Sequence, residues 1–229
     1  MSVIAANLQA VESDIAAAAQ QAGRTASDVA LLAVSKTVPP ATIREAYAAG
    51  QRAFGENYVQ EGVEKIAALA DLRGDIGWHF IGPLQSNKTR VVAEQFDWVH
   101  AIDRLKIAER LSAQRPAGLA PLQVCIQVNI SDEASKSGVA PAEVPALAQA
   151  IAVLPNLRLR GLMAIPAPAD DPDAQRRPFA ALRSLLDQLR QSGLNVDTLS
   201  MGMSADMDAA IAEGATLVRI GTAIFGARG

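Results

Sequence analysis

Lys36 is the residue of this sequence whose position most strongly indicates chemical reactivity. It directly follows the apolar run 29–35 (VALLAVS), which indicates a strand buried on both faces. At the end of such a strand the side chain is desolvated, which favours the neutral amine. A neutral amine can form a Schiff base with an aldehyde. A strand-end lysine that only extends into water is the simpler alternative.

Two loops near the C-terminus have the composition of a phosphate site. They lie in the segments 199–207 (LSMGMSADM) and 217–226 (LVRIGTAIFG). Their small and hydroxyl-bearing residues are Ser200, Gly202, Ser204, Gly221 and Thr222. Glycine lets the backbone approach an anion closely, and free N–H groups with hydroxyls can bind it. Either loop alone is a weak signal, since such residues are common in turns, but the two together favour phosphate binding.

Arg219 lies inside an apolar strand, between Val218 and Ile220, where an unpaired cation would be costly. It requires a partner, either a structural carboxylate or a ligand. A lysine that accepts an aldehyde, a phosphate site and this arginine together indicate pyridoxal phosphate. Lys36 would hold its C4′ atom and Arg219 would face its pyridine nitrogen. Because an arginine cannot accept a proton, the nitrogen would stay neutral and the ring would be a weak electron sink.

Four further polar residues have both a functional and a structural interpretation. Asn57 in GENY (55–58) either offers a donor and an acceptor to a ligand or caps a helix, and Glu56 could pair with a nearby cation. His79 and His100 have no spacing typical of metal ligands, so we expect hydrogen-bonded structural histidines and no metal site. His79 is nevertheless expected to point toward the same end of the fold as Lys36.

The elements that must position these residues alternate along the whole chain. The predicted strands are 29–36, 51–55, 77–82, 97–101, 122–130, 158–163, 196–201 and 216–220. The predicted helices are 41–49, 58–70, 86–95, 104–115, 141–153, 175–192 and 206–213, with an N-terminal helix at about 2–22. This alternation is typical of an α/β protein with a single (β/α)₈ TIM barrel, here one domain over 1–229. Such barrels bind ligands at the C-terminal ends of their strands.

Two polar segments interrupt the alternation. AIPAPADDPDAQRRP (164–178) is predicted to be a long loop after the sixth strand rather than a domain boundary, because the alternation resumes behind it. NISDEASKSG (129–138) carries Lys136, and a solvated loop is the default interpretation. A mobile lid or a second amine is the alternative.

Composition excludes several classes of function. The 229 residues carry 21 basic and 24 acidic side chains, a net charge of −3, so no overall positive field attracts nucleic acid or an anionic membrane. The N-terminus lacks the basic region of a signal peptide, and no apolar run is long enough to span a bilayer. With the single Cys125 no disulfide forms within the chain. We therefore expect a cytoplasmic protein.

Seven segments resemble the pyridoxal phosphate homeostasis protein family, the YggS/PROSC-type proteins. The segments are AVSKT (33–37), FGENYVQE (54–61), WHFIGPLQSNK (78–88), QVNISDEASKSG (127–138), RGLMAIP (160–166), LSMGMSADM (199–207) and VRIGTAIFG (218–226). They occur in the expected order and extend from about Val29 to Arg228. The resemblance implies a barrel like that of alanine racemase and other fold type III enzymes of pyridoxal phosphate.

The resemblance also assigns roles to residues. Lys36 matches the Schiff-base lysine of the family. The other matched positions that surround the cofactor are Asn57, Ser200, Met201, Ser204, Arg219, Gly221 and Thr222. Family members are thought to bind, buffer or deliver pyridoxal phosphate without efficient turnover, so apo-enzymes that need this cofactor are candidate recipients.

The sequence favours a carrier over an enzyme. Racemases of this fold add a second, β-rich domain, and a partner subunit supplies a tyrosine as the opposite acid–base group. We expect neither feature in this sequence. Its two tyrosines, Tyr47 and Tyr58, both lie on predicted helices. The lack of that domain also favours a monomer. The alternatives are a racemase-like enzyme that uses His79, Tyr58 or Lys136, a class I aldolase, and a structural protein that does not need Lys36.

Overall fold

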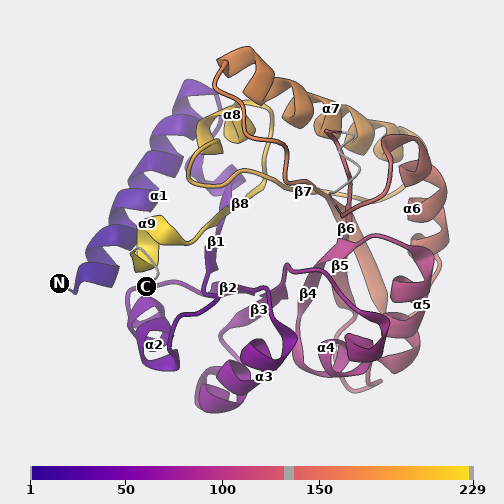
Figure 1. The fold of residues 1–229 in the computed structure, drawn as a ribbon, viewed down its shortest axis with the longest axis horizontal. Coiled ribbons are helices and arrows are strands. Elements are labelled where there is room, and N and C mark those ends of the chain that lie inside the picture. The colour runs from indigo at the N-terminus through magenta and orange to yellow at the C-terminus, as the bar shows by residue number, and fades with distance from the viewer. Residues whose placement is uncertain (1, 132–136, 227–229) are drawn as a thin grey trace.

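Eight short segments of the sequence form parallel strands that close into a barrel (Figure 1). The computed structural model describes residues 2–131 and 137–226. Each strand pairs with the next in the chain, and β8 pairs with β1. The strands are β1 (Ala30–Val34), β2 (Ala53–Glu56), β3 (Gly77–Phe80), β4 (Trp98–Ile102), β5 (Leu122–Gln127), β6 (Leu157–Met163), β7 (Thr198–Ser200) and β8 (Leu217–Ile220). The predicted (β/α)₈ barrel is confirmed, and all eight predicted strands overlap an observed one.

The helices surround the barrel, as the view along its axis shows (Figure 1). They are α1 (Val3–Gln21), α2 (Pro40–Ala48), α3 (Val59–Ala68), α4 (Thr89–Gln95), α5 (Leu105–Gln114), α6 (Val144–Ala152), α7 (Pro172–Gln191), α8 (Met207–Ala212) and α9 (Thr222–Phe225). Four 3₁₀ turns accompany them: η1 (Ala26–Asp28), η2 (Ala70–Leu72), η3 (Ser86–Lys88) and η4 (Pro141–Glu143). The predicted helices 86–95 and 141–153 therefore each begin with a 3₁₀ turn.

The loop predicted at 164–178 is shorter than expected, because α7 begins at Pro172. The Asp171 carboxylate accepts a hydrogen bond from the Ala174 amide at 2.7 Å, which caps the helix N-terminus. Pro172 takes the first helical position, where its fixed φ is already suitable and its missing N–H is not needed. The Pro- and Asp-rich composition thus marks a helix start as well as a loop, and Pro178 lies within the helix.

Buried apolar side chains connect the strands to the helices outside them. One large cluster includes the strand residues Trp78 and Val99 and the helix residues Ile107 and Leu186. Strand and helix residues therefore share one hydrophobic core. Within the described part of the chain, no helix is both long and apolar enough to cross a bilayer.

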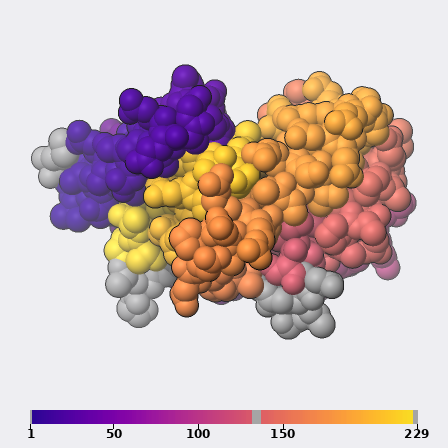
Figure 2. Space-filling model, turned by 90° about the horizontal axis from the view of Figure 1, so that it is seen from above, coloured from indigo at the N-terminus to yellow at the C-terminus, as the bar shows by residue number. Residues whose placement is uncertain are grey.

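The N-terminal helix α1 packs against the last two helices of the chain. Leu8, Val11 and Ile15 are buried on one face of α1, which packs against α8 and α9. The Asn7 side-chain amide also donates to the Ile224 carbonyl of α9 at 2.9 Å. Figure 2 shows the N-terminal segment lying directly against the C-terminal one. Through α9, this helix supports the turn that follows β8.

Candidate functional site

A cavity of about 350 Å³ opens at the C-terminal end of the barrel. Its lining residues all lie at or just beyond strand ends. Six of the predicted site residues are among them: Lys36, Asn57, Ser204, Arg219, Gly221 and Thr222. The volume lies within the range of small-molecule sites. The structure thus brings together residues that are up to 186 positions apart, counted from Lys36 to Thr222.

Apolar residues that the sequence did not single out complete the cavity wall. They are Val34, Ile81, Ile165, Met203 and Ala205. Each lies at a strand end or in the loop that follows a strand. A search for polar residues at strand ends cannot find them, although their positions relative to the strands were available in the sequence.

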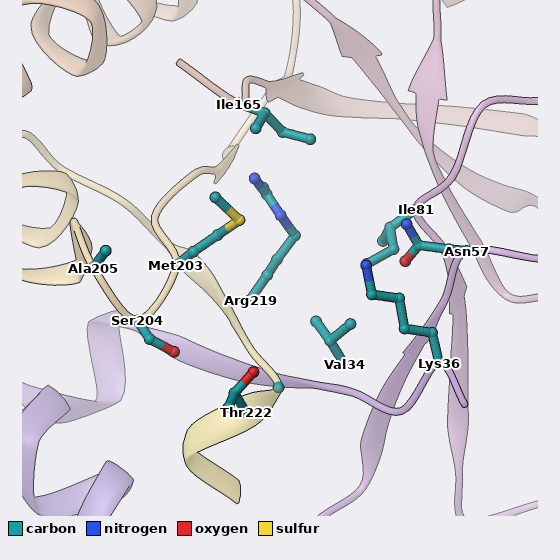
Figure 3. Close-up of a pocket in the computed structure, with 11 residues that line it drawn as sticks. Val34, Lys36, Asn57, Ile81, Ile165, Met203, Ser204, Ala205, Arg219 and Thr222 are labelled. Carbon is teal, nitrogen blue, oxygen red and sulfur yellow. The ribbon is translucent and has the colours of Figure 1, made fainter. Parts of the chain in front are cut away.

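The polar groups lie on different sides of the cavity (Figure 3). The side chains of Lys36 and Asn57 approach each other on one side, and the hydroxyl-bearing residues Ser204 and Thr222 lie on another. Arg219 extends from β8 into the space between them. The cavity therefore places an amine, an amide, a guanidinium and two hydroxyls around one volume.

A buried ionic network lies directly behind Lys36. The Lys65 ammonium, on α3, contacts both Glu56 carboxylate oxygens at 3.0 Å, one Glu61 oxygen at 2.5 Å and the Ser35 carbonyl at 2.6 Å. Burial raises the pKa of Glu56, and the neighbouring Lys65 cation and the Ser35 hydroxyl oppose that shift. The expected pairing of Glu56 with a cation is confirmed, with Lys65 as the partner.

The same network holds the backbone on both sides of Lys36. The Ser35 hydroxyl donates to Glu56 at 2.5 Å, and the Thr37 amide donates to Glu61 at 2.5 Å. Thr37 has a φ of 63°, in the left-handed region that non-glycine residues rarely adopt. We interpret the two carboxylates as the groups that stabilise this turn and direct Lys36 into the cavity.

Asn57 lines the cavity and also carries an unpaired acceptor. Its Oδ1 atom is buried and has no hydrogen-bond partner among the described residues. It does not cap α3, because Tyr58 occupies the N-cap position of that helix. Gly82 packs so closely on Asn57 that a Cβ atom there would lie 2.1 Å from the Asn57 carbonyl oxygen. A buried acceptor of this kind costs about 1–3 kcal/mol unless a ligand supplies a donor.

Arg219 is a buried cation that is held by uncharged groups. Its Nη1 atom donates to the carbonyl and hydroxyl oxygens of Ser200 at 2.6 and 2.8 Å, and Nη2 donates to the Ala164 carbonyl at 2.9 Å. Within the described residues no carboxylate forms an ion pair with it, so the structural ion pair considered above is absent there. Burial lowers the pKa of Arg219 to about 10, and the guanidinium remains charged at neutral pH. Three of its five N–H groups are used, which leaves two for a ligand.

The turn that carries Ser204 depends on a glycine. Gly202 has a φ of 95°, and a Cβ atom there would lie 2.6 Å from the Ala210 Cβ atom. Only glycine fits both the backbone conformation and the contact with α8. Ser204 on this turn, together with Gly221 and Thr222 after β8, forms the polar wall opposite Lys36.

Ser200 and Met201, which were also predicted to surround a ligand, lie behind the cavity. Both are fully buried, and neither lines the cavity. Ser200 contacts Arg219, whereas Met201 belongs to the main hydrophobic cluster. Their expected role as direct ligand contacts stays a prediction from the sequence.

The two histidines are hydrogen-bonded inside the barrel, as expected for structural residues. His79 Nδ1 lies 2.9 Å from His100 Nε2, and His100 Nδ1 lies 2.8 Å from Ser200 Oγ. In the described part of the chain, no cluster of side chains could hold a metal ion. The expectation that His79 points toward the Lys36 end is wrong, because it lines a second cavity among residues at the N-terminal ends of the strands. Periodicity within one short strand does not show which end a side chain reaches.

Acidification should destabilise the protein because both imidazoles are buried and neutral. Burial lowers the pKa of His79 to about 3 and that of His100 well below its usual 6.5. The unfolded chain takes up these protons first, so this contribution to stability is complete above pH 6.5 and is lost as the pH falls toward 3. Protonation of each histidine in the unfolded chain should lower the free energy of unfolding by about 2 kcal/mol as the pH falls from 7 to 5. Urea unfolding at the two pH values measures the loss.

The His79→Gln variant is the control for this pH dependence. It removes one of the two protonation sites, so the part of the loss assigned to histidine should fall by about half. An unchanged difference between pH 7 and pH 5 in this variant would contradict the assignment.

The predicted loop 129–138 is described only in part. Residues 132–136, which include Lys136, lie outside the described residues, so its interpretation as a lid or as a second amine stays a prediction.

Comparison with known proteins assigns the chain to a family. The sequence profile described as "Alanine racemase, N-terminal domain" matches residues 6–229. A protein of Pseudomonas aeruginosa named "Pyridoxal phosphate homeostasis protein" is 64% identical over 228 residues, which covers 100% of this chain and 97% of the relative. The Escherichia coli K12 protein of the same name is 59% identical, with 100% and 98% coverage. The chain belongs to the pyridoxal phosphate homeostasis protein family.

A solved structure of a related protein has the same fold as this chain. PipY of Synechococcus elongatus PCC7942, in its structure with pyridoxal phosphate bound, superimposes with a TM-score of 0.85 at 40% identity. The match covers 97% of this family member and 100% of PipY. The resemblance found in seven sequence segments is therefore confirmed for the chain as a whole. In the structure of this pyridoxal phosphate homeostasis family member, six of its eight expected site residues line one cavity.

Proposed function

We propose that this chain is a pyridoxal phosphate-binding protein of cofactor homeostasis, which holds the cofactor in the cavity at the C-terminal end of the barrel. The observation that carries the proposal is the meeting of Lys36, Asn57 and Arg219 in that cavity. The names of the close relatives and the pyridoxal phosphate bound to PipY support it.

The residues present fit this cofactor. Lys36 is the amine for a Schiff base with the aldehyde, and Arg219 offers two free N–H groups to the pyridine nitrogen side of the ring. Ser204, Gly221 and Thr222 form the phosphate end, and Asn57 accepts a hydrogen bond beside Lys36. When bound, pyridoxal phosphate supplies an aldehyde carbon that condenses reversibly with amines. Arg219 carries no acceptor atom, so it holds the ring by donation and cannot take a proton from it.

A carrier role agrees with these contacts and with the naming of the relatives as homeostasis proteins. We propose that the chain works as one domain and a cytoplasmic monomer, and that apo-enzymes requiring pyridoxal phosphate receive the cofactor from it. Ser200 contributes indirectly by holding Arg219, and Met201 by packing behind the turn.

Titration of the purified protein with pyridoxal phosphate tests the proposal. We expect a saturable absorption band of a covalently bound cofactor, trapping of the cofactor on Lys36 by borohydride, and recovery of activity when an apo-enzyme is added to the loaded protein. Incubation of the loaded protein with amino acids should yield no turnover. Absence of the band at excess cofactor, or trapping of a sugar phosphate instead, would favour the class I aldolase.

A further inference from the structure

We propose that Ser200, His100 and His79 form a hydrogen-bonded chain of fixed proton direction across the barrel, which positions Arg219 for the cavity. The three residues are positioning residues, because none of them lines the cavity that contains Lys36. The structural part of this inference stands on the contacts alone. Its consequence for the cofactor rests on the proposed function.

This hydrogen-bonded chain crosses the interior of the barrel and includes one residue from each of four strands. Arg219 of β8 contacts Ser200 of β7, Ser200 contacts His100 of β4, and His100 contacts His79 of β3, at 2.8, 2.8 and 2.9 Å. All four residues are at least 95% buried. The chain thus begins at the cavity lined by Arg219 and ends at the second cavity, near the opposite end of the barrel.

The donor and acceptor properties of these groups fix the direction of the protons. A guanidinium can only donate, so Ser200 Oγ accepts from Arg219 and its own hydrogen is free for His100 Nδ1. A neutral His100 that accepts at Nδ1 carries its proton at Nε2 and donates it to His79 Nδ1. His79 then carries its proton at Nε2. Both rings are neutral because burial lowers both pKa values.

The opposite direction leaves hydrogen-bonding groups unsatisfied. If His100 Nδ1 donated to Ser200, the serine oxygen would accept twice, and its hydrogen would find no other acceptor among the described residues. A buried hydroxyl without an acceptor costs about 1–3 kcal/mol. The direction from Arg219 to His79 satisfies every group from the guanidinium to His79 Nδ1. His79, which carries the remaining Nε2–H group, lines the second cavity.

The far end of the chain is held by stacking. The His79 ring lies parallel to Trp98, with 5.1 Å between centroids and 8° between planes, and the Arg160 guanidinium lies 4.7 Å from the Trp98 centroid. Arg160 in turn forms a two-bond ion pair with Asp197. Stacking holds the plane of the His79 ring, and in this plane Nδ1 lies within hydrogen-bond distance of His100 Nε2. Arg219 thus keeps Ser200 as its acceptor, although no carboxylate among residues 2–131 and 137–226 forms an ion pair with it.

Nitrogen NMR of the imidazole rings in the cofactor-free protein tests the proton direction. The sequence contains only two histidines, so a long-range ¹H–¹⁵N spectrum shows two rings, which the His79→Gln variant assigns. We expect both rings as neutral Nε2–H tautomers, unchanged from pH 8 to pH 5. An Nδ1–H tautomer or a charged ring at either position would overturn the proposal.

Binding measurements on two variants test the positioning of Arg219. Ser200→Ala should weaken pyridoxal phosphate binding by about tenfold or more, because Arg219 loses a charge-assisted hydrogen bond. It should also disturb the His100 tautomer. His100→Asn keeps an acceptor near the position of Nδ1, so its affinity for pyridoxal phosphate should stay within about threefold of wild type. His100→Leu removes that acceptor and should weaken binding as Ser200→Ala does.

Cys125→Ala is the matched control. Cys125 is fully buried in the barrel interior and lies outside the hydrogen-bonded chain. The control should lose stability and keep both tautomers and the wild-type dissociation constant. Equal weakening of binding in Ser200→Ala and Cys125→Ala would reduce the effect to general destabilisation and overturn the positioning role. If the wild-type protein does not bind pyridoxal phosphate, the proposed function is rejected, and with it the positioning of Arg219 for the cofactor. The imidazole tautomers test the proton direction of the hydrogen-bonded chain independently of binding.

Discussion

Lys36→Ala is expected to abolish the absorption band of covalently bound pyridoxal phosphate, even at saturating cofactor. Lys36 is the amine that lines the cavity, and the nearby Lys65 is buried in contacts to two carboxylates and a carbonyl. No other lysine within the described residues lines the cavity, so none can replace Lys36 there. Absorption spectra of the wild type and of Lys36→Ala, recorded before and after addition of pyridoxal phosphate, measure the effect.

Lys36→Arg is the matched control for this experiment, because it keeps the positive charge and removes the nucleophilic amine. We expect it to bind the cofactor without the covalent band, through Arg219 and the residues around Thr222. Its affinity should exceed that of Lys36→Ala because the charge is retained. A persistent covalent band in Lys36→Ala would contradict the assignment and direct attention to another amine.

Lys65→Met is expected to lower the free energy of unfolding by about 3–5 kcal/mol, because it leaves a buried carboxylate without its cation. The side chain of Glu56 is fully buried and that of Lys65 is 5% exposed. Burial already raises the pKa of Glu56, so in the variant this carboxyl group should take up a proton at higher pH than in the wild type. Urea unfolding monitored by circular dichroism measures the loss.

The double variant Lys65→Met/Glu56→Gln separates the charge effect from packing. It removes both buried charges and should lose clearly less stability than the sum of the two single variants. Arg44→Ala, which breaks an exposed ion pair with Asp71, should change stability little. If Lys65→Met proves as mild as Arg44→Ala, the network behind Lys36 does not stabilise the fold.

The sequence predicted the architecture well, because strand-like and helix-like segments alternate along it. The apolar run ALLAV became β1, and the later strands were predicted from their alternation with helical patterns. Boundaries were less certain where one composition suits two structures. Asp171 and Pro172 belong to a loop-like segment, yet together they form the cap and first residue of α7.

The sequence by itself determined which chemical groups are present at the strand ends. Lys36 after β1, Asn57 after β2, and Gly221 with Thr222 after β8 had to meet at one end of any barrel with this strand order. Only the tertiary structure decided the partners of these groups. The contacts of Lys65 with Glu56, and of His100 with Ser200, depend on which face and which height of the barrel each side chain occupies.

That height is set by the stagger of the strands when the barrel closes, which no local pattern contains. It is the reason why His79, three residues before the loop residue Gly82, reaches the end of the barrel away from Lys36. In the same way, the sequence required a partner for Arg219, but only barrel closure selected Ser200 and the histidines behind it. Residues 100 positions apart, such as His100 and Ser200, meet because non-adjacent strands face one another across the interior.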